Sequence, residues 1–271
     1  MAGTIRPHVI ALLSDFGTED PYVGCLKGAI TKINPIAPVI DVCHALPPYN
    51  ITSAAFILGA IYNDFPEKTI FVCVVDPGVG SGRPIIIATA GRNFFIAPDN
   101  GILTPVFSDP EFMHVYQATA DHFFLPSPSK TFHGRDIMAP LAAWITKGIE
   151  VANMGECIDT YIRLELPKSK LVAGSILQGQ IMHIDHFGNC ITNISRQQIE
   201  VLKTNGKKFI RALANGREVQ RCCDYYAQIP EGPEPACVVG SLGYIEVACN
   251  RASARQILAA EVGAEVGLVF E

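Results

Sequence analysis

The sequence predicts two domains: an α/β N-terminal domain with a mostly parallel sheet over residues 1–165, and a smaller all-β domain, a barrel or sandwich, over residues 171–271. In the first part, short apolar runs alternate with stretches of helical period, as is typical of helices packed on a parallel sheet. Beyond about residue 165 the runs are short, rich in β-branched residues and separated by tight turns. A length of 271 residues also favours two domains.

The N-terminal domain begins with strands and helices in alternation. Residues 8–13 indicate a buried strand, after which Asp20 is expected to be the N-cap of a helix and Pro21 its first residue. Residues 39–42 form the next strand, and about residues 52–62 form a second helix. Such an order predicts parallel strands joined by helical crossovers.

Three further apolar runs continue the predicted sheet, at residues 70–75, 85–88 and 94–97. The run at 70–75 has no polar interruption, which is typical of a strand buried on both faces. The segment TFHGRD at 131–136 precedes a helix that extends through residue 145. We therefore expect the N-terminal domain to end in a helix that covers the sheet.

The C-terminal domain follows a predicted linker at residues 166–170. Asn205-Gly206 and Asn215-Gly216 bracket an apolar run, and such dipeptides are strong signals for hairpin turns. These signals predict a domain made of short antiparallel strands. Its further strands are expected at residues 236–239, 244–248 and 266–270.

Composition excludes several classes of protein. Hydrophobic residues make up 49% of the chain and charged residues 17%, with a mean hydropathy of +0.25, so the core is ample. The net charge of −5 argues against a nucleic-acid partner. The nine cysteines are scattered without a CxxC pair, which argues against a disulfide framework. We find no signal peptide and no apolar run of membrane-spanning length, so we expect a soluble, cytoplasmic protein with no membrane partner.

The segment VVDPGVGSGRP, residues 74–84, carries the clearest chemical signal. Asp76 stands at the end of a buried strand, where open α/β sheets bind their ligands. Three glycines follow, which allow the main chain to approach a ligand closely, and then Arg83. A second interpretation remains open at this point: the segment is a glycine-rich turn in which Asp76 and Arg83 pair only with each other.

Other polar clusters lie at the ends of predicted elements, and each has a purely structural interpretation as well. These are a helix cap, a histidine bound to backbone, and a hairpin turn. His44 and His186 are expected to be structural or surface residues. The clusters contain Asp15 and Asp20; His133, Arg135 and Asp136; and Asp185, Phe187 and Asn189.

Seven segments of the chain, taken in order, resemble the S-adenosyl-L-methionine (SAM) hydrolase family, also called SAM hydroxide adenosyltransferases, which are relatives of fluorinase and chlorinase. The resemblance covers nearly the whole chain. The segments are SDFGTEDPYVG (14–24), DVCHALPP (41–48), VVDPGVGSGR (74–83), PDNGIL (98–103), TFHGRDIMAP (131–140), IDHFGNCITNI (184–194) and SLGYIEVACNRASA (241–254).

The resemblance implies an enzyme that hydrolyses SAM to adenosine and L-methionine, without a cofactor or a metal. It implies a homotrimer in which each active site lies between the N-terminal domain of one subunit and the C-terminal domain of the next. The family's catalytic triad around the attacking water corresponds to Asp76, Arg83 and His133. The halogenating relatives lack this aspartate, so Asp76 favours water over a halide as the nucleophile.

The resemblance also implies a substrate site. One departure is Leu242, which stands where the halogenases have an arginine. The IDHFGN segment is also one residue shorter than the halogenase form. The implied contacts are Asp15 with the ribose, Tyr49 over the junction of ribose and methionine, Asp185 and Asn189 with the methionine end and the base, Phe187 and Tyr226 as walls of the adenine pocket, and Ser241 and Arg251 as further polar contacts.

The chemistry of the reaction agrees with these residue types. Methionine leaves the ribose C5′ as a neutral thioether, so no general acid is needed. The difficult part is to hold a weakly nucleophilic water in line with the C5′–S bond; a carboxylate can accept its proton and a guanidinium can stabilise hydroxide-like character. We therefore expect Asp76 to orient the water as a base, Arg83 to stabilise the developing hydroxide, and His133 to complete the hydrogen bonding.

Two other functions remain to be weighed. A metal-dependent hydrolase could use Asp15, Asp76 and His133 as ligands, but the spacing of histidines does not match a zinc site and Arg83 would repel a cation. A non-catalytic sensor of SAM or adenosine could keep the pocket without turnover, but it would not need a water-activating group. Product analysis with and without a chelator separates the three.

Overall fold

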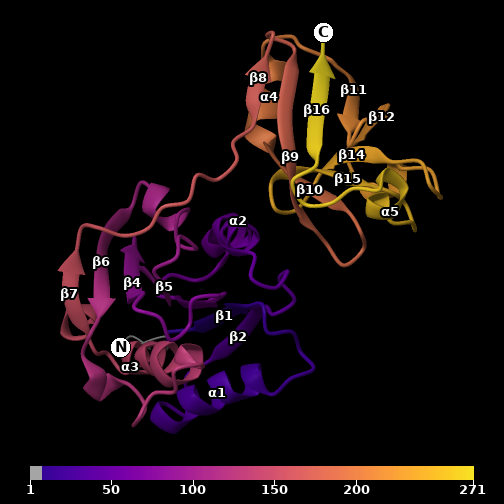
Figure 1. Cartoon of the computed structure of the whole chain (residues 1–271). Coiled ribbons are helices and arrows are strands. Elements are labelled where there is room, and N and C mark those ends of the chain that lie inside the picture. The colour runs from indigo at the N-terminus through magenta and orange to yellow at the C-terminus, as the bar shows by residue number, and fades with distance from the viewer. Residues whose placement is uncertain (1–7) are drawn as a thin grey trace, which may run out of the picture. The chain divides into compact units, whose positions relative to one another are not determined.

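The computed structural model describes residues 8–271, which divide after Glu165 into two compact units, each described here by itself (Figure 1). The two-domain architecture predicted from the sequence is confirmed. All nine cysteines are free. No helix within residues 8–271 is long and apolar enough to cross a membrane.

The N-terminal unit is built on a seven-stranded sheet with the order β2-β1-β3-β5-β4-β6-β7. The pairings give five strands one direction, with β4 and β7 opposed to them, so the sheet is mostly parallel, as predicted. The strands are β1 (Ile10–Ser14), β2 (Val39–Cys43), β3 (Ile70–Val74), β4 (Ile85–Ala90), β5 (Asn93–Pro98), β6 (Phe112–Ala118) and β7 (Gly155–Ile158).

The strand at Ile85–Ala90 is not part of a parallel alternation. β4 pairs antiparallel with β5, and only Gly91 and Arg92 connect the two. A parallel crossover needs a dozen or more residues, so this short connection forces a hairpin. Gly91 has φ +54°, a left-handed conformation that the turn requires.

Helices cover both faces of this sheet: Figure 1 shows α1 and α3 on one side and α2 on the other. Leu26 and Ile30 of α1 and Leu141 of α3 are fully buried in one cluster with sheet residues. Burial on both faces explains why the run at β3 has no polar interruption. The helices are α1 (Tyr22–Ile33), α2 (Ile51–Ile61) and α3 (Ala139–Thr146), with a π-helical turn η4 (Gly134–Met138) and the 3₁₀ turns η1 (Tyr62–Asp64), η2 (Val106–Ser108), η3 (Asp121–Phe123) and η5 (Val151–Asn153).

The predicted start of the first helix is wrong by one residue. α1 begins at Tyr22, Pro21 occupies the N-cap position, and no side chain caps the helix. The first helical hydrogen bond runs from the Cys25 N–H to the Pro21 carbonyl, which moves the cap past Asp20. In contrast, Asn50 caps α2, since its side chain accepts a hydrogen bond from the Ser53 N–H at 2.8 Å.

The C-terminal unit holds a nine-stranded sheet with the order β12-β11-β16-β9-β10-β15-β14-β13, and β8 also pairs with β9. Most of its neighbouring strands are antiparallel, although β13 and β14 are parallel. The strands are β8 (Lys170–Val172), β9 (Ile176–Ile184), β10 (Cys190–Ser195), β11 (Phe209–Ala214), β12 (Arg217–Val219), β13 (Arg221–Cys223), β14 (Ala236–Val239), β15 (Tyr244–Ala248) and β16 (Glu265–Phe270).

Two helices that the sequence prediction missed accompany this sheet: α4 (Arg196–Thr204) and the short α5 (Ala254–Leu258), with a 3₁₀ turn η6 (Tyr226–Gln228). A capping box between Ser195 and Gln198 starts α4. The dipeptide Asn205-Gly206 was predicted to form a hairpin turn. This prediction is wrong, because the dipeptide follows the end of helix α4. Asn215-Gly216 does join β11 to β12 in a hairpin.

Candidate active site

Asp76, Arg83 and His133 form one hydrogen-bonded cluster in the N-terminal unit. Asp76 follows β3, Arg83 precedes β4, and His133 precedes η4. The Arg83 Nε donates to Asp76 Oδ1 at 2.7 Å, while its Nη2 donates to Asp76 Oδ2 and to His133 Nδ1, the latter at 3.2 Å. The side chains of Asp76 and Arg83 are only 5% and 11% exposed. Asp76 and Arg83 therefore do pair with each other, as the structural interpretation had it. The pair also bonds to His133, as a polar site requires.

A close backbone contact brings the two loops of this cluster together. Gly80 has φ +80°, and a Cβ atom there would lie 2.1 Å from the carbonyl oxygen of Lys130. Only glycine fits this position, so the loop that carries Arg83 packs against the segment that leads to His133. The close approach at Gly80 is therefore to the chain's own backbone, and not to a ligand as the sequence suggested.

One donor group in the cluster is unused. Arg83 Nη1 is buried and has no hydrogen-bond partner among the residues that the structure describes. Buried donors are nearly always paired, so an orphaned guanidinium nitrogen beside a carboxylate and an imidazole indicates a place for a bound oxygen atom.

His133 is held in its neutral form. Burial lowers the pKa of His133, the neighbouring Arg83 guanidinium lowers it further, and Asp76 and Asp136 oppose the shift. Because Arg83 can only donate, Nδ1 of His133 must accept, which places the ring proton on Nε2. The imidazole is therefore a hydrogen-bond donor on the side that faces away from Arg83.

Asp15 and Tyr49 are also in contact. The Tyr49 N–H donates to Asp15 Oδ2 at 2.8 Å. Tyr49 has φ +64°, an uncommon left-handed conformation for a residue with a large side chain, and its side chain is on the surface, with the residue 74% exposed. The carboxylate of Asp15 thus helps to hold the backbone that presents the Tyr49 ring.

In the C-terminal unit, Asp185 organises the loop between β9 and β10. Its Oδ1 accepts hydrogen bonds from the N–H groups of Phe187 and Asn189 at 2.9 and 2.8 Å, and its Oδ2 accepts from Asn189 Nδ2 at 2.9 Å. Asn189 is buried, whereas Phe187 is 75% exposed. Gly188 (φ +83°) lies so near Ser253 that a Cβ would come within 2.1 Å of the Ser253 hydroxyl. This loop is therefore well fixed and presents Phe187 outward.

The remaining residues predicted to contact the substrate, Tyr226, Ser241 and Arg251, also lie in the C-terminal unit. Ser241 is exposed in the turn between β14 and β15. Arg251 has φ +57°, and its exposed side chain forms an ion pair with Glu231 at 3.1 Å. Tyr226 donates its hydroxyl hydrogen bond to Glu246 at 2.7 Å.

Glu246 was missed by the sequence analysis. It is 3% exposed on β15, and burial raises its pKa, although the hydrogen bond from Tyr226 opposes the shift. Burial, with Glu246 as acceptor, also raises the pKa of Tyr226 far above its ordinary value. A glutamate within the apolar run of residues 244–248 was the signal, because a buried acid in a strand needs a partner.

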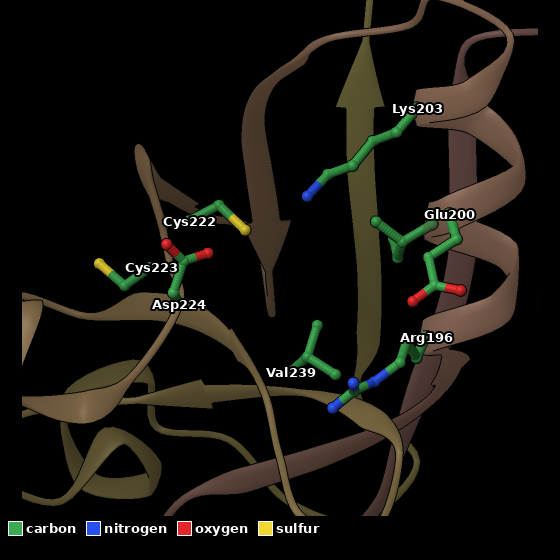
Figure 2. Close-up of a pocket in the computed structure, with 8 residues that line it drawn as sticks. Arg196, Glu200, Lys203, Cys222, Cys223, Asp224 and Val239 are labelled. Atoms are coloured by element: carbon green, nitrogen blue, oxygen red, sulfur yellow. The ribbon is translucent and has the colours of Figure 1, made fainter.

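A cavity of about 190 Å³ lies elsewhere on the C-terminal unit, between α4 and β13 (Figure 2). Figure 2 shows Lys203 of α4 extending toward Cys222, with Arg196 and Glu200 on the same helix. None of the predicted site residues lines this cavity. Its lining residues are Arg196, Ile199, Glu200, Lys203, Cys222, Cys223, Asp224 and Val239.

The ligand set of the metal-hydrolase alternative is not assembled. Within residues 8–271, no three His, Cys, Asp or Glu side chains are grouped as a metal site requires. Asp76, one of the three supposed ligands, instead has both oxygens hydrogen-bonded to Arg83.

Family models match both units of the chain. Residues 10–155 match the SAM hydroxide adenosyltransferase N-terminal domain, and residues 179–267 match the C-terminal domain of the same family. The chain belongs to the SAM hydroxide adenosyltransferase family. The resemblance noted in the seven sequence segments is therefore confirmed.

Relatives and solved structures agree with this family membership. An (R)-S-adenosyl-L-methionine hydrolase of Thermus thermophilus is 35% identical, over 98% of this chain and 100% of the relative. A relative with the same name from Methanocaldococcus jannaschii is 30% identical, over 97% of this chain and 96% of the relative. A fluorinase of an Actinoplanes species is 28% identical, over 90% and 91%. The crystal structure of a conserved Thermotoga maritima protein superposes with a TM-score of 0.89 at 32% identity, covering 96% of this chain and 100% of that one.

Proposed function

We propose that this protein hydrolyses SAM to adenosine and L-methionine, with water attacking the ribose C5′. Membership of the family and the names of the relatives support this reaction. The observation that carries the proposal is Arg83 Nη1, which is buried beside Asp76 and His133 and has no partner among residues 8–271. A donor placed there can hold a water next to a carboxylate that accepts its proton, which a protein that only binds SAM does not require.

In the proposed mechanism, Arg83 Nη1 donates to the oxygen of the attacking water. Two of the four lone-pair sites of the Asp76 carboxylate are occupied by Arg83, which leaves others to accept a hydrogen bond from the water and then its proton. His133 accepts from Arg83 Nη2 at its Nδ1 and so completes the hydrogen bonding that orients the guanidinium. As the O–C5′ bond forms, the C5′–S bond breaks and its electron pair returns to sulfur, so methionine leaves uncharged.

The other predicted residues would bind the substrate. We propose that Asp15 binds the ribose hydroxyls, which charge-assisted hydrogen bonds recognise strongly, and that Tyr49 covers the reacting junction. Asp185 already accepts three hydrogen bonds within its loop, so its contribution to the methionine end is limited to its remaining lone pairs. The groups assigned to the base and to further polar contacts are Asn189, Phe187, Tyr226, Ser241 and Arg251.

We also propose a cytoplasmic homotrimer with active sites shared between subunits, as the family resemblance implies. Membership of the family, whose models match both units of the chain, supports this proposal. SAM is then the only substrate besides water, and no cofactor takes part.

Product analysis tests the reaction directly. Purified protein is incubated with SAM, with and without a chelator, and the products are resolved by chromatography. Adenosine and methionine in equal amounts, unaffected by the chelator, are expected. Binding of SAM without products would support the sensor instead, and loss of activity on chelation would support a metal-dependent enzyme.

The variant Asp76→Asn tests the assigned role. It keeps the shape of the side chain and should bind SAM with affinity close to that of the wild type while losing turnover. If affinity were lost and turnover of bound SAM were unchanged, Asp76 would be a binding residue.

A further inference from the structure

A series of hydrogen bonds ends at Ser14, the residue before Asp15, and is not used by the proposed mechanism. Lys27 of α1 donates to Asp41 Oδ2 at 2.6 Å, and His44 Nε2 donates to Asp41 Oδ1 at 3.1 Å. His44 Nδ1 lies 2.7 Å from the Ser14 hydroxyl, which in turn accepts from the Phe16 N–H at 3.4 Å. The chain therefore runs from the surface to the residue directly before Asp15.

The donors and acceptors in this chain point one way. The Asp41 carboxylate can only accept, so His44 Nε2 donates to it, and in the tautomer with its proton on Nε2 the Nδ1 accepts from the Ser14 hydroxyl. Burial alone would raise the pKa of Asp41, but the hydrogen bonds from Lys27 and His44 hold it below its ordinary value. Asp41 thus stays ionised and keeps His44 in this tautomer.

The arrangement is not a nucleophilic site, although it contains the residue types of a serine hydrolase triad. Ser14 is 0% exposed on β1, and its oxygen already accepts from Phe16. An attacking hydroxyl must reach a bound substrate, and this one cannot. This series of hydrogen bonds can therefore affect the site only through the loops that it holds in place.

What it holds is the pair of loops that carry two proposed substrate contacts. The His44 carbonyl accepts from the Gly17 N–H at 2.7 Å, and Asp15 Oδ2 accepts from the Tyr49 N–H at 2.8 Å. With the Ser14–His44 bond, three hydrogen bonds thus join the end of β1 and the loop that follows it to the loop after β2. His44 takes part in two of them, one through its ring and one through its backbone.

We propose that His44 is a positioning residue for substrate binding: through Ser14 it fixes the Asp15 loop against the Tyr49 loop. The inference rests on the proposed function, because Asp15 and Tyr49 are assigned to the substrate there. His44 touches no substrate atom in this scheme. The Nδ1 of His44 matters more for substrate binding than its Nε2, because Nδ1 bonds to Ser14, the residue before Asp15, whereas Nε2 bonds to Asp41.

Two substitutions separate the two ring nitrogens. In His44→Asn the amide oxygen can replace Nδ1 and accept from Ser14, whereas in His44→Gln the longer amide can replace Nε2 and donate to Asp41. We expect the Kd for adenosine and the KM for SAM to rise about tenfold in His44→Gln and less than about threefold in His44→Asn, with kcat unchanged in both. Ser14→Ala should match His44→Gln, and the double variant Ser14→Ala/His44→Gln should be no worse than either.

The measurements are calorimetric titration with adenosine, steady-state kinetics with SAM, and thermal unfolding. Asn34→Ala is the control, since it removes a half-buried hydrogen bond from Asn34 Nδ2 to Thr146 Oγ1 at 2.8 Å in the same unit. It should lower the melting temperature without changing affinity. If His44→Gln fails to fold, Ser14→Ala carries the test alone.

The outcomes separate this inference from the proposed function. A wild-type protein that neither cleaves SAM nor binds adenosine overturns the proposed function. If the wild-type protein does both, and His44→Asn, His44→Gln and Ser14→Ala bind adenosine with the same affinity as the wild type, only the positioning role is overturned. An affinity loss that follows the melting temperature, and that Asn34→Ala shares, overturns it as well.

Discussion

Arg83→Lys is the substitution that most directly tests the proposed reaction. The guanidinium makes three hydrogen bonds, to both Asp76 oxygens and to His133 Nδ1, and its Nη1 has no partner within residues 8–271. A lysine keeps the positive charge beside Asp76, so the buried carboxylate is not left unpaired. Its compact ammonium group cannot also reproduce the planar fork that reaches His133 and the position of Nη1.

The size of the effect follows from the role of that free donor. Removing one preorganised donor aimed at a developing oxyanion costs about 10²–10³ in kcat, or about 2.7–4 kcal/mol. We expect a loss of that size for Arg83→Lys, because Nη1 is the donor assigned to the hydroxide-like water. KM should change little, since the interaction strengthens only as charge develops in the transition state.

Arg135→Lys is the matched control. Arg135 also makes a bidentate pair with a buried carboxylate, with its Nε and Nη2 at 2.6 and 2.8 Å from the oxygens of Asp136, and it lies two residues from His133. Its kcat should stay within about threefold of wild type. Steady-state kinetics with SAM measure both variants. A kcat for Arg83→Lys as high as that of the control, or a change confined to KM, would refute the assignment of Nη1 to the water.

Three further predictions concern pH, ribose recognition and assembly. Because burial and Arg83 lower the pKa of His133 from its ordinary 6.5, neutral His133 persists on acidification, and the acid limb of the kcat profile should have its midpoint below pH 6.5; a midpoint at or above pH 6.5 would contradict this prediction. Wild-type protein should bind adenosine roughly tenfold to a hundredfold more tightly than 2′-deoxyadenosine, and Asp15→Ala should abolish most of this preference; an equal preference in both proteins, measured by calorimetry, would remove Asp15 from the ribose site. Mixed trimers of inactive Asp76→Asn and Asn189→Ala subunits should recover about a quarter of wild-type activity, the fraction of shared sites that random pairing restores. No recovery in trimers shown to be mixed would argue against sites shared between subunits.

The sequence predicted those parts of the fold that depend on burial alone. The uninterrupted apolar run of β3 and the apolar residues at helical spacing in α1 indicate directly which side chains face the core. Asp76, Arg83 and His133 were expected near one another because the family resemblance assigns them to one triad. From the residues alone, only Asp76 and Arg83 were grouped, and the hydrogen bond between Arg83 and His133 joins the third residue to them.

Features set by short connections and by pairing were not predictable in the same way. β4 is as apolar as a parallel strand, and only the two-residue link to β5 decides its direction. Helix α4 has a polar surface and ends in Asn205-Gly206, a dipeptide that serves a helix end as well as a hairpin. The free Nη1 of Arg83 depends on where a guanidinium lies once two of its nitrogens are engaged, which no sequence pattern records.

The carboxylates at the candidate site are bound to the chain before any substrate arrives. Asp76 holds Arg83, Asp15 holds the backbone of Tyr49, and Asp185 holds Asn189. Each acid is acceptor-only and has more lone pairs than these bonds use, so it can fix its own loop and still bind a ligand. The cost of ordering these loops is then met during folding, which leaves more of the interaction energy for binding and for the transition state. It follows that removing one of these carboxylates disturbs a loop as well as a contact. Positioning is therefore tested by variants next to the carboxylate, such as His44→Asn and His44→Gln, and direct contact by ligands that lack one hydroxyl, such as 2′-deoxyadenosine.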